Sequence, residues 1–362
     1  MRKNFIDNLR WIVILLLIPY HAAQAFNTWN ELNYICFQPN KILSSFIVFL
    51  SPYYMPLMFL LAGMSARYAL EKRSYRQFVV ERTERLLLPF LFGTLAFCPV
   101  LSYMGDKNNF NWQGSFFEHY KTFFTKLTDL TGFDGGFCIG QFWFLFFLFL
   151  ISIAGVGLVK LSNLIFKNRH RKCSLPFPLL FFFLLPLPFL YDFLSVGGKS
   201  FAEYMYVFLI GFCILSEDAM IEKAAECRYV TLVIGVMAGI INCWMFIWSE
   251  KQFGIINIIA KAVCEWFMLL SLIGIGKKSL NFKGKISTYM SQRSFIFFSF
   301  HFIWIVLFQY WLKSLLGGNT LLMYLIPIVF AYLATFICTE IAIRFPALCF
   351  LLGTKPLCKV SN

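Results

Sequence analysis

The stretch QFWFLFFLFLISIAGVGLV, residues 141–159, contains nineteen consecutive residues without a charge. A helix needs about 20 mostly apolar residues to cross the hydrocarbon core of a bilayer, so this stretch can be a membrane span. The rest of the 362-residue chain has a matching composition, with 59% hydrophobic and 14% charged residues, whereas a soluble domain carries roughly 25% charge. The composition excludes a large water-soluble protein, a coiled coil and collagen.

Nine other stretches are long enough, or nearly so, to cross a bilayer. We therefore predict an all-α polytopic membrane protein with about ten transmembrane helices, in a single membrane domain over residues 1–362. An extracytoplasmic loop at about 105–140 is expected to contain a short helix around 113–127. The expected spans are 11–26, 42–66, 86–104, 141–159, 175–194, 201–216, 229–249, 253–276, 294–312 and 320–343.

The basic residues set the expected orientation, because Lys and Arg accumulate in short cytoplasmic loops. If the N-terminus is cytoplasmic, 24 of them fall on the inner side and 7 on the outer side. This predicts a multi-pass protein of the bacterial cytoplasmic (inner) membrane with both termini inside. The formal charge of +14 then needs no nucleic acid partner.

The N-terminus also resembles a signal peptide, with a charged start, an apolar run and Ala23-Gln24-Ala25 as a cleavage site. Pro19 and His21 interrupt the apolar run, however, and the charge count is equally good with the segment retained. We expect it to be retained.

Cysteines and buried charges give weaker signals. The eleven cysteines form no CxxC pair or Cys/His ligand spacing, so no metal site is predicted. Cys36 and Cys138 are both expected outside, where a disulfide is possible, although unpaired thiols are favoured. Two pairs with i,i+4 spacing, Lys261 with Glu265 and Glu340 with Arg344, are expected to be structural ion pairs.

Four histidines are the candidates for proton transfer. His119 and His170 lie in loops and are expected to be solvated surface residues, whereas His21 and His301 lie within spans, where ionisable residues are functional hypotheses by default. For His301 a hydrogen bond to the helix backbone is an equally good explanation.

His21 follows Arg10 by eleven residues, which places the imidazole roughly 16 Å deeper in the bilayer than the guanidinium. Pro19 between them removes a backbone hydrogen bond and favours a bend. A second basic cluster, Arg82 and Arg85, is spaced to lie on one helix face and could bind a phosphate. The alternative is an ordinary surface helix on which Glu81 pairs with Arg85.

These residues resemble signatures of the membrane acyltransferase 3 family, and within it the branch that contains glucan biosynthesis protein C. The matching segments are Asp7-Asn8-Leu9-Arg10 with His21, the stretch 55–66 with Arg82-x-x-Arg85, Gln141-Phe142-Trp143-Phe144-Leu145, and Ser294-Phe295 with His301. They occur in order along nearly the whole chain. Trp11 and Phe298 depart from the family pattern, as does Gln141, where the family often has a histidine.

The resemblance implies an O-acyltransferase that moves an acetyl or succinyl group from cytoplasmic acyl-CoA, its donor substrate, to a hydroxyl of an extracytoplasmic glycan or glycolipid. It makes His21 and Arg10 the catalytic pair, Arg82 and Arg85 the acyl-CoA-binding pair, and His301, Trp143 and Gln141 possible accessory residues. Imidazole suits this chemistry either as a base for the hydroxyl or as a nucleophile. The sequence leaves both roles open, together with the oligomeric state.

Other classes of membrane protein remain as alternatives. A polytopic transporter or a glycan or lipid flippase would also have many spans, buried charges and a basic inner rim, and would move its substrate without covalent change. A purely structural or sensory protein has no sequence feature in its favour.

Overall fold

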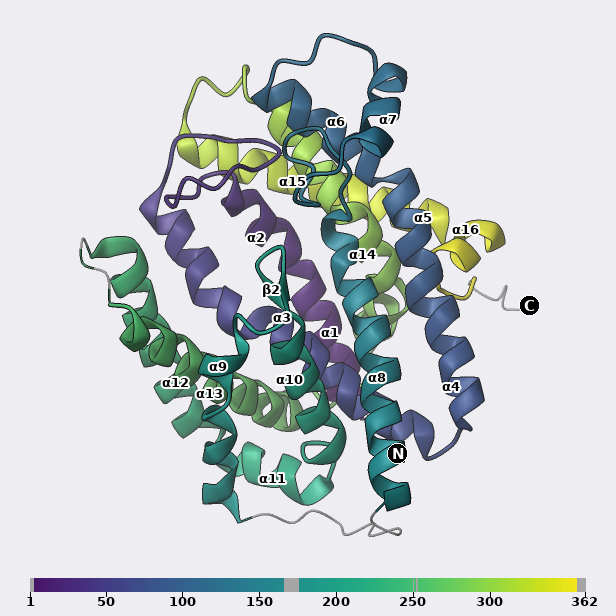
Figure 1. The fold of residues 1–362 in the computed structure, drawn as a ribbon, viewed down its shortest axis with the longest axis vertical. Helices are drawn as coiled ribbons and strands as arrows, with labels where there is room; N and C mark the ends of the chain where they lie inside the picture. The colour runs from purple at the N-terminus through teal and green to yellow at the C-terminus, as the bar shows by residue number, and fades with distance from the viewer. Residues whose placement is uncertain (1–2, 166–175, 250, 252, 357–362) are drawn as a thin grey trace. The chain divides into compact units, whose positions relative to one another are not determined.

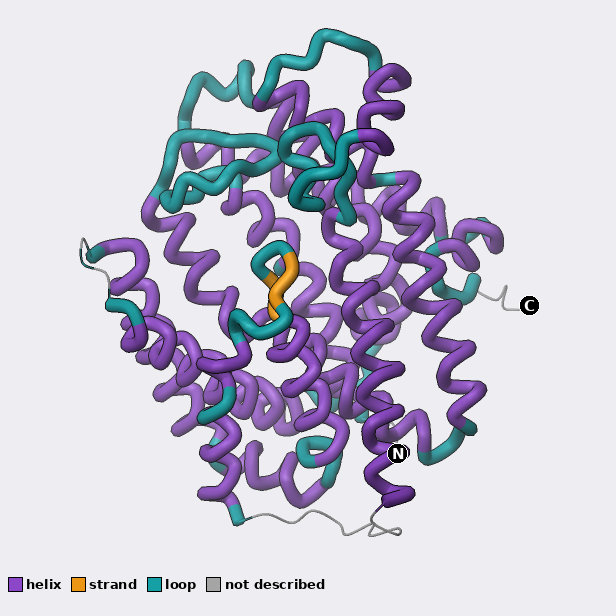
Figure 2. The backbone as a smooth tube through the Cα atoms, in the orientation of Figure 1, coloured by secondary structure: helices purple, strands orange, loops and turns teal. Residues whose placement is uncertain are grey.

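The computed structural model describes residues 3–165, 176–249, 251 and 253–356, and helices make up most of this part of the chain (Figure 1, Figure 2). Within these ranges the only strands are β1 (Ser195–Val196) and β2 (Lys199–Ser200), which pair in an antiparallel hairpin. His170 and the basic residues around it, from 167 to 172, lie outside the described residues.

The chain divides into two compact units. Unit 1 comprises Met1–Val13, Val48–Arg82 and Phe147–Ser287, and unit 2 comprises Ile14–Ile47, Thr83–Phe146 and Thr288–Asn362. Four helices continue from one unit into the other: α1 (Asn4–Leu15), α3 (Lys41–Leu70), α8 (Trp143–Ile165) and α14 (Lys285–Leu312).

The remaining elements each belong to one unit. Besides the hairpin, unit 1 contains α4 (Tyr75–Arg82), the 3-10 helix η3 (Phe177–Leu184), α9 (Leu187–Leu190), α10 (Phe201–Cys213), α11 (Asp218–Glu226), α12 (Arg228–Cys243), the π-helix η4 (Trp244–Trp248) and α13 (Ile255–Ser279). Unit 2 contains α2 (Leu17–Gln24), the π-helix η1 (Thr83–Leu87), α5 (Leu88–Ala96), α6 (Cys98–Asn109), α7 (Phe116–Thr125), the 3-10 helix η2 (Gly140–Phe142), α15 (Thr320–Ala342) and α16 (Pro346–Leu351).

The all-α polytopic fold is confirmed, and the number of complete spans is smaller than the ten expected. Among the described residues, eight helices are long and apolar enough to cross a bilayer. They are Asn4–Gln24, Lys41–Leu70, Tyr75–Asn109, Gly140–Ser162, Arg228–Trp248, Ile255–Ser279, Lys285–Leu312 and Thr320–Ala342.

The two other expected spans are broken. Of the expected span 175–194, the described residues 176–194 form a short 3-10 helix and one turn of α-helix, because prolines at 176, 178, 186 and 188 remove backbone donors. Residues 201–216 form only α10, after which the chain turns by 107° into α11. If this bent pair is counted as one span, the total is nine.

The surface of α12 shows why these helices need lipid. Val230, Val233, Met237 and Ile240 are all about half exposed or more and follow one another along one face. The opposite face is buried and carries small or polar residues. This pattern is the reverse of a soluble helix, and it matches a helix whose apolar face contacts acyl chains while small residues pack against other helices.

Small residues allow two helices of unit 1 to cross at close range. Gly63 of α3 lies against the backbone carbonyl of Phe208, and Gly211 of α10 lies against the backbone carbonyl of Leu60. A Cβ atom at either glycine would overlap the facing backbone, so the crossing of α3 and α10 requires glycine at both positions.

Prolines within the spans release carbonyls that side chains then bind. Pro19 cannot donate to the carbonyl of Leu15, and the hydroxyl of Tyr332 donates to that oxygen at 2.7 Å. Within a bilayer such replacement is required, because no water is present to bind the carbonyl. The same replacement follows Pro52 and Pro99, where Asn242 donates to Val48 at 3.5 Å and Tyr120 donates to Leu95 at 3.3 Å.

Candidate active site

His21 lies near the end of α2 in unit 2, on the same helix face as Gln24. Its Nδ1 atom is 2.8 Å from Oε1 of Gln24. Because an amide oxygen can only accept, Nδ1 carries the proton and the lone pair of the neutral imidazole is on Nε2. Gln24 therefore selects the tautomer in which Nε2 can accept a proton or attack a carbonyl.

A second imidazole lies beside the first. His301 of α14 is fully buried, and its ring centroid is 5.3 Å from that of His21, with 33° between the ring planes. Its Nδ1–H donates to the carbonyl of Phe298 at 2.6 Å, which places its lone pair also on Nε2. In the described part of the chain that buried Nε2 has no hydrogen-bond partner. The ring of Phe302 packs against His21 with centroids 4.3 Å apart.

The predicted hydrogen bond between His301 and the helix backbone is thus confirmed for Nδ1 but not for Nε2. Ser299, a local alternative, donates its hydroxyl to the carbonyl of Phe295 at 3.2 Å. The buried acceptor on Nε2 remains to be satisfied, and a hydroxyl group from a substrate or a water molecule has the required donor.

Gln141 and Trp143 occupy the junction of η2 and α8. Nε2 of Gln141 donates to the carbonyl of Ser299 at 3.2 Å, which attaches the residue to α14 two positions before His301. Oε1 of Gln141 is buried and has no partner in the described part of the chain. Trp143 is the first residue of α8, and its accessory role stays a prediction.

Arg10 belongs to unit 1 and joins two of the signature segments. Its Nη2 donates to the carbonyl of Leu61 at 2.9 Å and to the hydroxyl of Ser65 at 2.6 Å, both on α3. Nη1 lies 3.5 Å from the carboxylate of Asp7. The guanidinium therefore fixes α1 against α3, in addition to any role toward a substrate.

The pair Arg82 and Arg85 spans a change of helix type. Arg82 is the last residue of α4, with its guanidinium carbon 4.8 Å from the ring centroid of Phe78, and Arg85 lies in the π-helix η1. The step from Arg82 to Arg85 is therefore not regular α-helix, and their joint binding of a phosphate stays a prediction. Glu81 forms an ion pair with Arg73.

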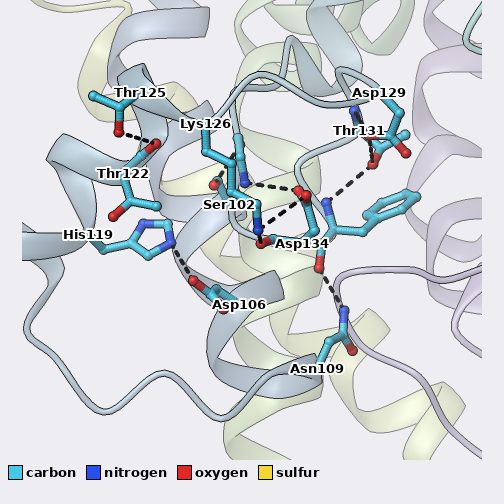
Figure 3. A network of polar contacts seen from close by, with 12 residues as sticks. Ser102, Asp106, Asn109, His119, Thr122, Thr125, Lys126, Asp129, Thr131 and Asp134 are labelled. Carbon is cyan, nitrogen blue, oxygen red and sulfur yellow. Dashed lines mark hydrogen bonds and ion pairs between the residues drawn. The ribbon is translucent and has the colours of Figure 1, made fainter.

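His119 is buried, and the prediction that it is a solvated surface residue is wrong. It lies on α7, which begins with a capping box formed by Ser115 and Glu118, and its Nε2 is 3.2 Å from Oδ2 of Asp106. Figure 3 shows this pair pointing toward each other. Burial lowers the pKa of His119, and the carboxylate of Asp106 opposes that shift.

The segment around His119 is held by further polar contacts. Lys126 forms an ion pair with Asp134 at 3.2 Å, and Asn109 donates to the carbonyl of Phe133 at 2.9 Å (Figure 3). Cys36 and Cys138 are both free thiols, as favoured above. These contacts give the segment between α6 and η2 a fixed structure without a disulfide in its described residues.

Sequence reasoning missed Gln24, the residue that sets the tautomer of His21. In the sequence it stands out only as part of the Ala23-Gln24-Ala25 cleavage-site pattern. The spacing of three residues places Gln24 on the same helix face as His21, and that signal was available in the sequence.

Comparisons with known proteins identify the family. A family profile described as an acyltransferase domain matches residues 3–343. The chain belongs to this acyltransferase family. It is also similar to proteins called glucans biosynthesis protein C from Salmonella agona (strain SL483) and Salmonella enteritidis PT4 (strain P125109). Each is 24% identical over 381 residues, covering 98% of this chain and 95% of the relative. No solved structure matches.

Membership in the acyltransferase family agrees with the resemblance drawn from the sequence. The chain is a polytopic membrane acyltransferase, and its two candidate imidazoles lie on helices long enough to span a bilayer.

Proposed function

We propose that this acyltransferase moves an acetyl or succinyl group from cytoplasmic acyl-CoA to a hydroxyl of an extracytoplasmic glycan or glycolipid. The reaction joins the acyl carbonyl carbon to the hydroxyl oxygen and breaks the thioester bond. The hydroxyl proton ends on the thiol of coenzyme A. The enzyme must therefore accept a proton from the acceptor and return it to the leaving group.

The contact between Nδ1 of His21 and Oε1 of Gln24 is the observation that carries this proposal. A neutral imidazole with its lone pair on Nε2 can take the hydroxyl proton as the oxygen attacks, and general-base catalysis of this kind contributes about 10²–10⁴-fold in rate. Gln24 holds the ring in that state through Nδ1. His301, with the same tautomer 5.3 Å away, supplies a second acceptor for a hydroxyl in the same unit.

Basic residues suit the donor end of the reaction. Coenzyme A carries phosphates, and guanidinium groups bind phosphate through charge-assisted, often bidentate hydrogen bonds. In the proposal Arg82 and Arg85 bind these phosphates. The uneven distribution of basic residues supports a topology with both chain termini on the cytoplasmic side of a bacterial inner membrane. The relatives called glucans biosynthesis protein C support a glucan as the acceptor class.

Mass spectrometry of cell-surface glycans tests the proposal. Strains carrying the intact gene, no gene, or the His21→Ala variant are compared, with the amount of protein in the membrane measured for each. We expect an added acetyl or succinyl mass only with the intact gene. An Arg82→Ala strain serves as the contrast, since weaker donor binding should be rescued by higher acyl-CoA in isolated membranes.

Two results would contradict the proposal. Normal acylation by a stable His21→Ala protein would remove the imidazole from the reaction. Unchanged acylation in all strains, with unmodified glycan accumulating inside the deletion strain, would instead indicate a flippase.

A further inference from the structure

Unit 1 contains a group of ionisable side chains buried within its helices. Glu265 of α13 is fully buried, and Glu203 of α10 is 6% exposed. Such residues are costly within a membrane-spanning helix bundle, and they are retained mainly where they bind something or carry protons. The acyl-transfer chemistry proposed above uses neither of them.

Hydrogen bonding leaves one oxygen of Glu265 unsatisfied. The hydroxyl of Tyr191 donates to Oε2 at 2.8 Å. Oε1 is buried and has no partner in the described part of the chain. A carboxylate oxygen in that position costs several kcal/mol in a low-dielectric interior. A proton on Oε1 would remove the charge and convert the unsatisfied acceptor into a donor.

Charge balance points to the same oxygen. Lys261 is one turn from Glu265 on α13, but its ammonium lies 3.5 Å from the ring centroid of Tyr191, and the expected Lys261–Glu265 ion pair is not among the ion pairs that the structure shows for the described residues. Lys261 is also the charged group that acts on Glu203. The charged groups near Glu265 are Glu203 and Lys261. One ammonium therefore balances one carboxylate, and the second carboxyl needs a proton to make the group neutral.

Three polar residues lie on one face of α13. Asn257, Lys261 and Glu265 are spaced four residues apart, so they form a polar stripe from the beginning of α13 toward its middle. The amide oxygen of Asn257 is also buried and without a partner in the described chain, so it is a second unsatisfied acceptor on this face. The remaining titratable groups around Glu265 carry no positive charge. They are Tyr206 of α10, Cys264 of α13 and, beyond Cys264, Cys243 of α12 and Tyr53 of α3.

We propose that Glu265 is an exchangeable proton-binding site within the membrane, in which Glu203 and Lys261 form the charge-balanced partner pair. Asn257 and Lys261 lie on the same face of α13 as Glu265, toward the helix end that begins at Ile255. A proton fits this site better than a metal ion does, because the described residues contain no group of three His, Cys, Asp or Glu side chains able to hold a metal ion. The proposal is independent of which acyl group the enzyme transfers.

Infrared spectroscopy of the purified full-length protein in lipid nanodiscs tests the site. A protonated carboxyl has a carbonyl stretch that an ionised carboxylate lacks, and this band shifts in D₂O if the proton exchanges. We expect the wild-type band to be lost in Glu265→Gln, to shift in D₂O, and to disappear as the pH is raised. Glu340→Gln is the matched control, because Glu340 lies in a span but forms an ion pair with Arg293 and should contribute no such band.

A second variant keeps the test valid if Glu265→Gln does not fold. In Glu203→Gln the ammonium of Lys261 is left to balance Glu265, so the band should disappear at a lower pH than in the wild type. A band that is identical in the wild type and folded Glu265→Gln, no band at any pH, or a band that neither exchanges nor titrates would each overturn the proposal.

Discussion

The bond between His21 and Gln24 makes a prediction that separates positioning from catalysis. We expect Gln24→Met, which keeps the length of the side chain and removes its acceptor, to lower kcat while leaving the KM for acyl-CoA nearly unchanged. The reason is that Nδ1 loses its 2.8 Å partner, so the ring is no longer held in the tautomer that presents the lone pair at Nε2.

The size of the effect follows from one neutral hydrogen bond. Such a bond contributes about 1 kcal/mol net, which corresponds to a ~5-fold loss of rate. Removing the imidazole itself in His21→Ala should cost about 10²–10⁴-fold, the range of general-base catalysis. The two variants are therefore expected to differ by at least about one order of magnitude.

The assay measures release of free coenzyme A thiol by protein in nanodiscs with acyl-CoA and a glycan acceptor, over a range of pH. Gln24→Glu is the informative companion, because a carboxylate favours the protonated ring and should move the acid limb of the pH–rate profile to higher pH. Full activity of Gln24→Met together with an unmoved profile in Gln24→Glu would refute the positioning role. A folded Gln24→Met that is as inactive as His21→Ala would show that Gln24 itself contacts substrate.

Two further predictions concern stability. Tyr332→Phe leaves the carbonyl of Leu15 without its donor, so the thermal midpoint in detergent should fall by an amount equivalent to about 1 kcal/mol. Tyr229→Phe, at an exposed position, should not change the midpoint. Equal midpoints for the two variants would contradict the reasoning. Because burial lowers the pKa of His119, the unfolded chain binds a proton first as the pH falls below about 6.5, and stability is lost through that window down to the lower folded pKa. Thermal midpoints measured from about pH 8 to pH 5 should therefore decline in the wild type and decline less in His119→Gln, and parallel declines would contradict the assignment.

Local composition determined the class of the protein. In lipid, the backbone N–H and C=O groups of a long uncharged run find their hydrogen-bond partners within a helix. The all-α polytopic fold therefore followed directly from the length of these runs. Eight of the ten expected spans are present as complete helices. The other two expected spans are not complete helices. Length and hydropathy alone do not show that the prolines between 176 and 188 interrupt a helix, or that the chain bends after Cys213.

Tertiary structure decided which polar groups meet. The sequence singled out His21 and His301, 280 residues apart, but a spacing along the chain carries no information about contact between distant helices. Only the fold places their rings 5.3 Å apart, and only the fold turns Glu340 toward Arg293 instead of Arg344. His119 shows the same limit, because its loop position predicts exposure while Asp106 on the preceding helix makes burial tolerable. The sequence by itself determined that the chain is a membrane protein, that it is built of helices and which side chains are candidates for chemistry, since these depend on local hydrophobicity and residue chemistry. The partners of those side chains depend on packing between segments far apart in the chain, and for that reason only the tertiary structure assigned them.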